Sequence, residues 1–250
     1  MSLRQIAINA LNLNRLRVMA GKALRRLETD TQVAASAWAR ARAMSIDAFC
    51  EALDPELWRE TLSFVAQVEE NAKPVLAGFP YDLGGGGAYP LLYFLVRHQR
   101  PSTIIETGVA AGWSSLTILK ALKINGNGKL YSSDFPYFRL PNPERFIGVL
   151  VPDDLRDAWH LDKRGDAIAL PAILAQCGPI DLFHYDSDKS YAGRRRALET
   201  VAPQLKQGAT IIVDDIQDNL FFRDWVEERG LQFTAFEFGG KFVGLVKQNG

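Results

Sequence analysis

The chain has 250 residues, a length that fits one α/β domain or one domain with an appendage. Its hydrophobic fraction of 47% is enough for a sizeable core. Its 29 basic and 29 acidic residues balance, which argues against partners such as nucleic acid or anionic membranes. Cys50 and Cys177 are too far apart in sequence to indicate a disulfide framework, and without a membrane-spanning run or a signal-peptide core we expect a cytoplasmic protein.

The first third of the chain carries helical rather than strand patterns. Asp54 followed by Pro55 is typical of a helix start, with Asp54 as the N-cap, and this helix is predicted to run to about Asn71. We therefore expect residues 1–88 to form a helical region that caps the substrate or mediates dimerisation. Residues 89–250 are expected to form the main domain.

Four consecutive glycines, Gly84 to Gly87, precede a helical segment. No strand pattern comes before them, so the context of a phosphate-binding P-loop is missing. We interpret the run as an elbow or lid at the mouth of a site.

From Ser102 onward, strand and helix patterns alternate, which predicts a parallel sheet. Two alternating strands around Gly239-Gly240 predict a C-terminal antiparallel hairpin. The predicted fold class is therefore α/β, a doubly wound, Rossmann-like sheet of seven strands with an N-terminal helical extension. The predicted strands are 103–106, 129–133, 160–161, 180–185, 209–213, 232–238 and 242–247.

Acidic side chains follow two strands that we expect to be neighbours. Asp186, Asp188 and Lys189 come after the fourth predicted strand, and Asp214 and Asp215 follow the fifth. Ligands of open α/β sheets bind at this edge, and carboxylates there suit an oxygen-loving ion such as Mg²⁺, with Mn²⁺ or Ca²⁺ as alternatives. Helix capping is the other interpretation, but it does not explain all of these acids together.

The loop after the first predicted strand contains Gly108 and Gly112, which let the backbone approach a ligand closely. Asp134, at the end of the second strand, stands where a carboxylate can accept both hydroxyls of a ribose. This spacing matches a βαβ unit that binds an adenosine ligand. A tight turn that only packs a helix on a strand explains the glycines equally well.

These segments resemble a known family. Residues 104–108 with 112–115 resemble the first motif of class I S-adenosylmethionine (SAM)-dependent methyltransferases, and 165–167 resemble their adenine-side loop. Residues 186–191 and 208–215 are similar to the fourth- and fifth-strand motifs of metal-dependent O-methyltransferases of the caffeoyl-CoA, catechol and macrocin-type sugar classes. The resemblance implies that residues 89–250 form a SAM-dependent methyltransferase domain.

The resemblance also implies roles for individual residues. Glu106 and Gly108 would lie near the methionine part of SAM, Ser114 would contact its carboxylate, Asp134 would hold the ribose, and Asp166 with Ala167 would border the adenine. The alternative is that Glu106 is only a charge at the end of a strand and has no contact with the cofactor. The full set of expected cofactor-binding residues is Glu106, Gly108, Gly112, Ser114, Asp134, Asp166, Ala167 and Asp186.

By the same resemblance, the metal ligands would be Asp186, Asp214 and Asp215. Lys189 stands where caffeoyl-CoA-type enzymes carry the catalytic base, and Asp188 is the rival candidate. His184 is interpreted as a buried structural histidine.

Arg194, Arg195 and Arg196 are expected to form a solvated face, with contact between Arg194 and an anionic substrate as the alternative. Aromatic residues of the 135–146 insertion (Phe135, Tyr137 and Phe138) are expected either to stack on an acceptor ring or to form the core of the insertion.

The expected activity is methyl transfer from SAM to a hydroxyl of a small molecule, assisted by a divalent cation, in a homodimer. A metal-independent N- or C-methyltransferase and a non-catalytic adenosine-ligand module are the alternatives.

Overall fold

The computed structural model describes residues 29–137 and 140–248, and its centre is an eight-stranded sheet in the order β1-β7-β8-β6-β5-β2-β3-β4. The five strands from β2 to β6 are parallel to one another, and β8 runs antiparallel to both β6 and β7. This arrangement confirms the predicted Rossmann-like α/β sheet with its C-terminal hairpin. The strands are β1 (Ala43–Met44), β2 (Thr103–Thr107), β3 (Lys129–Ser133), β4 (Trp159–Asp162), β5 (Ile180–Tyr185), β6 (Leu205–Val213), β7 (Phe233–Phe238) and β8 (Lys241–Lys247).

Helices cover both faces of the sheet, which is why the central strands are nearly continuous apolar runs. On one face, α6 (Tyr89–Gln99) and α7 (Trp113–Asn125) share a core with sheet residues such as Ile104 and Leu182. On the other face, α8 (Asp166–Leu174), α9 (Tyr191–Val201) and α10 (Phe221–Glu228) share a core with Ile105 and Phe183. Successive residues of a strand therefore serve opposite cores.

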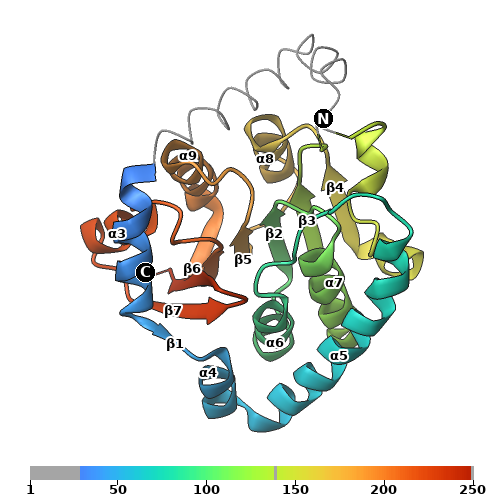
Figure 1. Cartoon of the computed structure of the whole chain (residues 1–250), viewed down its shortest axis with the longest axis horizontal. Helices are drawn as coiled ribbons and strands as arrows, with labels where there is room; N and C mark the ends of the chain where they lie inside the picture. The colour runs from blue at the N-terminus through green and yellow to red at the C-terminus, as the bar shows by residue number, and fades with distance from the viewer. Residues whose placement is uncertain (1–28, 138–139, 249–250) are drawn as a thin grey trace.

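The segment before the main domain wraps around its outside, from α3 (Thr29–Arg40) through α4 (Ile46–Leu53) to α5 (Pro55–Ala77) (Figure 1). Asp54 caps α5 as predicted, because its carboxylate accepts a hydrogen bond from the Leu57 amide at 2.9 Å. The helix runs six residues beyond the predicted end, with Pro74 inside it.

The expectation that the first third of the chain has no strand is wrong. Ala43 and Met44 form β1, which pairs with Ala235 and Phe236 of β7 at the edge of the sheet. A two-residue strand has no alternation that a sequence could reveal, because its extended form comes from pairing with the neighbouring edge.

The insertion after β3 folds over the domain beside the glycine run. It contains the 3₁₀ helix η2 (Pro143–Phe146), and a second one, η3 (Asp153–Ala158), follows it before β4. The Phe146 ring is buried against Phe79 and Tyr81, and the Tyr137 hydroxyl donates a hydrogen bond to the Leu83 carbonyl at 2.7 Å.

Tyr137 and Phe146 therefore belong to a small core that the insertion shares with residues before the glycine run, such as Phe79 and Tyr81, whereas Phe135 lies against Gly165. Phe138, the third aromatic residue named for acceptor stacking, lies outside the described residues. Residues 1–28 of the region expected to be helical also lie outside them. Across 29–137 and 140–248, no helix has both the length and the apolar character to span a membrane.

Candidate active site at the carboxyl ends of the strands

The loop after β2 is held by backbone contacts that require glycine. Gly108 and Gly112 have φ angles of +83° and +98°, where side chains are strained. A Cβ at Gly108 would collide with the carbonyl of Asp186, and one at Gly112 would lie 2.9 Å from the Cα of Gly148. The glycines thus let this loop lie directly against two neighbouring loops, whether or not a ligand binds there.

Asp134 follows β3 and anchors the same loop. Its Oδ2 accepts hydrogen bonds from the amides of Val109 and Ala110, at 3.1 and 2.7 Å. Burial raises the pKa of Asp134 to about 6, although these amides and that of Phe135 oppose the shift. The carboxylate predicted to hold a ribose therefore already orders the loop predicted to approach the cofactor.

Asp166, at the start of α8, connects two strand ends. Its carboxylate accepts hydrogen bonds from the hydroxyls of Ser133, at 2.6 Å, and of Ser187. Burial raises the pKa of Asp166 against the effect of these hydroxyls. Ala167 is exposed, and Ser114 is buried in the first turn of α7.

Glu106 is fully buried at the end of β2, so it is more than an exposed strand-end charge. Its Oε2 accepts hydrogen bonds from the hydroxyls of Ser115, at 2.6 Å, and Ser132, at 2.8 Å. Its Oε1 faces His184 Nδ1 across 3.7 Å. The sequence did not reveal that Glu106 and His184 are paired in register across β2 and β5.

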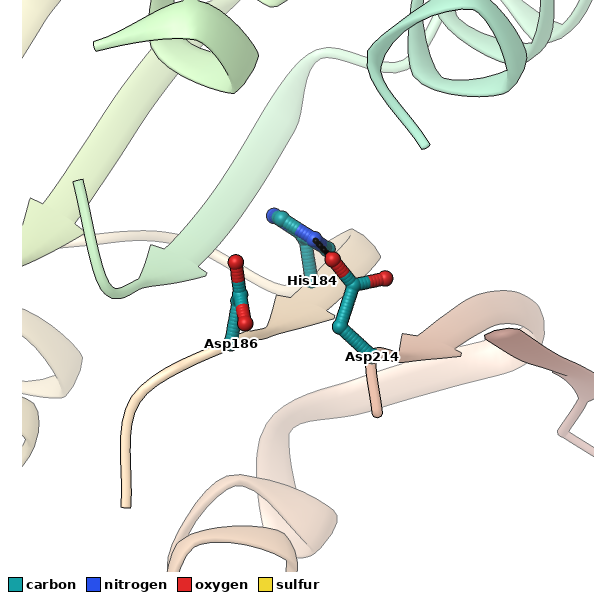
Figure 2. Close-up of side chains that lie close together, drawn as sticks. All are labelled: His184, Asp186 and Asp214. Atoms are coloured by element: carbon teal, nitrogen blue, oxygen red, sulfur yellow. Dashed lines mark ion pairs between the residues drawn. The ribbon is translucent and has the colours of Figure 1, made fainter. Parts of the chain in front are cut away.

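His184, Asp186 and Asp214 form the group that best fits a cation (Figure 2). One ligand atom from each lies within 4.8 Å of the others, and His184 Nε2 lies 3.7 Å from Asp214 Oδ2. Within the described residues, neither ring nitrogen of His184 has a hydrogen-bond partner, and neither does Asp214 Oδ1. Burial lowers the pKa of His184, but Asp214 and Glu106 outweigh it and raise that pKa to about 9. Buried, unpaired donors of this kind suit a divalent ion.

Asp215, the third predicted ligand, turns away from that group. Its backbone has a φ of +54°, and its carboxylate lies 2.9 Å from Lys189 Nζ and 3.1 Å from Lys241 Nζ. Burial raises the pKa of Asp215, but the two lysines outweigh burial and hold it well below its usual range. The structure thus brings Asp186 and Asp214 together with His184, while Asp215 pairs with lysines.

The two candidate bases lie in different surroundings. Lys189 Nζ contacts Asp186 Oδ1 as well as Asp215, and burial lowers the pKa of Lys189. Asp188 accepts a hydrogen bond from the Ser190 amide at 3.0 Å and lies 3.8 Å from Arg196 Nη2, so it faces α9. Of the two, Lys189 is the one in contact with the acidic group.

Arg194 is buried beneath the two acidic loops, where it binds their backbone, and is not part of a solvated face. The side chain is 1% exposed. Its guanidinium donates hydrogen bonds to the carbonyls of Asp214, at 2.9 Å, and Asp215, at 2.8 Å, and a longer one, at 3.3 Å, to the carbonyl of Lys189. The expectation for this residue is therefore wrong, whereas Arg195 and Arg196 are exposed as expected. Three consecutive arginines give no signal of which one points inward.

The glycine run lies directly over the acids. A Cβ at Gly87 would overlap Asp214 Oδ2 and lie 3.6 Å from Asp186 Oδ2, and a Cβ at Gly86 would overlap the Trp113 side chain. Gly84 and Gly85 have open space around them. Only a chain without side chains at 86 and 87 can cover the carboxylates this closely.

Residues 105–216 match the family model described as a methyltransferase domain. No curated protein matches the chain. Among solved structures, an O-methyltransferase from Bacillus cereus in complex with SAH is similar at 18% identity and a TM-score of 0.57, over 73% of this chain and 91% of that one.

A methyltransferase from Geobacter sulfurreducens is similar at 21% identity and a TM-score of 0.53, over 74% of this chain and 89% of that one. The O-methyltransferase TomG from Streptomyces achromogenes, in complex with SAM, has 18% identity and a TM-score of 0.50, over 83% of this chain and 100% of that one. These likenesses show the fold, and the family match places the methyltransferase domain on the strands and loops described above.

Proposed function

Because residues 105–216 match a methyltransferase domain, we propose that this chain is a class I SAM-dependent methyltransferase that transfers the methyl group to a hydroxyl oxygen of a small molecule with the help of a divalent cation. The observation that carries the proposal is the contact of Lys189 with Asp186 beside Asp214, at the sheet edge where the glycine loop lies against Asp186. Ligands of open α/β sheets bind at this edge.

SAM would lie along the loop after β2. Gly108 and Gly112 bring the backbone close, Ser114 opens α7, and Asp134 and Asp166 follow on the next two strands of the sheet edge. The SAH and SAM complexes named for two similar structures support this cofactor.

Asp186 and Asp214 would hold the cation, because their carboxylates converge and Asp214 Oδ1 is buried without a partner among the described residues. A bound divalent ion such as Mg²⁺ would lower the pKa of the acceptor hydroxyl and fix its position. Asp215 would act through its contact with Lys189, which keeps Nζ beside the acids.

The acceptor oxygen would attack the methyl carbon of the sulfonium while its proton passes to the neutral amine of Lys189, the form that burial favours by lowering the pKa of that group. A new carbon–oxygen bond forms as the carbon–sulfur bond breaks, and S-adenosylhomocysteine leaves with the electron pair on sulfur. Asp188 is the weaker candidate base because its carboxylate caps the turn before α9.

The segment before residue 89, the glycine run and the insertion after β3 would form the cover of the acceptor pocket. Gly87 lies on the acids, and Tyr137 ties the insertion to Leu83 beside the run. The helices of this segment would also supply a homodimer interface, and the site of action would be the cytoplasm.

The test is a methyl-acceptor screen with catechols, glycosides and hydroxylated metabolites, read by mass spectrometry with and without chelator. We expect a methyl ether product that chelation suppresses. Lys189→Met should abolish turnover and leave SAM affinity by calorimetry unchanged, whereas Asp188→Asn should retain most turnover.

Each alternative predicts a different result. Methylation of nitrogen or carbon that persists in chelator would favour the metal-independent enzyme. SAM binding without transfer to any acceptor would favour the adenosine-ligand module, and near-normal turnover of Lys189→Met would move the role of base to Asp188.

A further inference from the structure

A line of buried acids and one histidine crosses three neighbouring strands. Glu106 Oε1 lies 3.7 Å from His184 Nδ1, and His184 Nε2 lies 3.7 Å from Asp214 Oδ2. The three side chains are at most 3% exposed. Among the described residues, no hydrogen-bond partner meets Glu106 Oε1, the two ring nitrogens or Asp214 Oδ1. Buried polar groups without partners are costly, so a set of four indicates a group that they hold.

Glu106 is oriented toward one nitrogen of the ring. The hydroxyls of Ser115 and Ser132 occupy its Oε2 and so fix Oε1 opposite His184 Nδ1. When a cation takes the place of the proton on Nε2, a carboxylate beside Nδ1 favours the tautomer that keeps hydrogen on Nδ1 and gives the lone pair of Nε2 to the cation. Histidines that ligate metals are commonly oriented in this way.

The lone pair on Nε2 then faces the carboxylates that the cation needs. Asp214 Oδ2 lies 3.7 Å away, and Asp186 contributes an oxygen within the same 4.8 Å group. Lys189 contacts Oδ1 of Asp186, whereas Oδ2 lies on the side of Gly87 and Asp214. Asp215 is directed to lysines, so His184 takes the third position of the group.

We infer that His184 Nε2 is a ligand of the cation beside Asp186 and Asp214, and that the site therefore takes a first-row transition-metal ion such as Mn²⁺ in preference to Mg²⁺. The inference rests on the proposed function, because it names the ligands and the class of ion at the same site. Imidazole nitrogen suits transition metals, whereas Mg²⁺ requires oxygen donors. We expect Mn²⁺ to bind about tenfold or more tightly than Mg²⁺.

The test uses the full chain after chelator treatment. Mn²⁺ binding is followed by electron paramagnetic resonance, with Mg²⁺ as the competitor, and pulsed measurements detect coupling of Mn²⁺ to the nitrogen of a histidine ring. Labelling the histidines with ¹⁵N should change this coupling. His184→Gln should remove it and weaken Mn²⁺ binding about tenfold or more.

The chain offers a matched control, because its other two histidines, His98 and His160, are exposed. His160→Gln should retain both the coupling and the affinity. The labelled wild-type spectrum needs no variant, so it decides the question even if His184→Gln does not fold.

Mn²⁺ that binds without nitrogen coupling would overturn the inference. So would a Mn²⁺ affinity that falls in Asp215→Asn but stays unchanged in His184→Gln. Either result leaves the proposed methyl transfer intact, since three carboxylates would then hold the ion. Absence of any ion binding would also overturn the inference, and the acceptor screen would decide separately whether methyl transfer occurs.

Discussion

Replacing Arg194 tests whether the two acidic loops depend on one buried guanidinium. In Arg194→Met the methionine keeps most of the stem's volume but removes the donors to the carbonyls of Asp214 and Asp215, at 2.9 and 2.8 Å. Leaving buried carbonyls without donors costs roughly 1–2 kcal/mol each, so we expect the free energy of unfolding to fall by about 3 kcal/mol.

The assay is urea unfolding, combined with backbone hydrogen exchange of the segments 186–190 and 214–219. The neighbouring residue supplies the control, because Arg195 is exposed and stacks over Tyr191. Arg195→Met should change stability by less than about 0.5 kcal/mol and leave exchange unchanged. Equal losses in the two variants, or a loss in Arg194→Met below about 1 kcal/mol, would refute the assigned role.

Three further outcomes follow from the structure. Gly87→Ala should lower turnover at least tenfold by displacing Asp214, and Gly85→Ala, which adds a Cβ in open space, should not; equal turnover would contradict this close approach. The pKa of Asp134 is raised, so ionisation of this carboxyl destabilises the folded wild type. Relative to the cofactor-free wild type, Asp134→Asn should therefore gain about 1 kcal/mol of stability as pH rises from about 4 to 6, a value reduced because the group is partly exposed. A difference in urea unfolding that does not depend on pH would refute this. Asp181 is the opposite case. Burial raises the pKa of this carboxyl, but Lys206 and backbone amides outweigh burial and lower it. Asp181→Asn should therefore remove at most about 1 kcal/mol of stability at neutral pH, and this loss should vanish as pH falls below the usual carboxyl value.

The fold could be predicted because strands buried on both faces leave an apolar signature. β5 and β6 each end in a run of buried residues followed by an acid, and their positions follow from that pattern. β1 could not be predicted, because its two residues become a strand only by pairing with β7.

The site could be predicted only in part, since sequence locates a side chain without its direction. Asp186 and Asp214 follow neighbouring parallel strands, so their convergence follows from topology. Asp215 is one residue further along, but its positive φ sends the carboxylate to the lysines. His184 was correctly expected to be buried, yet its register with Glu106 exists only once β2 and β5 pair.

On the proposed function, the chemistry and the acceptor specificity would be carried by different parts of the chain. The strand-end loops interlock through backbone groups: the Asp186 amide donates to the Thr107 carbonyl at 2.9 Å, and the Asp214 amide donates to the Tyr185 carbonyl at 2.9 Å. Such contacts fix the carboxylates independently of which acceptor binds.

The cover would be built differently, because the insertion contacts the segment before the glycine run through side chains: Tyr137 donates to the Leu83 carbonyl, and Phe146 packs on Phe79 and Tyr81. Loops of this kind tolerate change while the scaffold beneath them persists. Substitutions in the cover away from Gly86 and Gly87 should therefore alter which acceptors are methylated and leave SAM affinity unchanged, whereas substitutions at the strand ends should affect every acceptor alike.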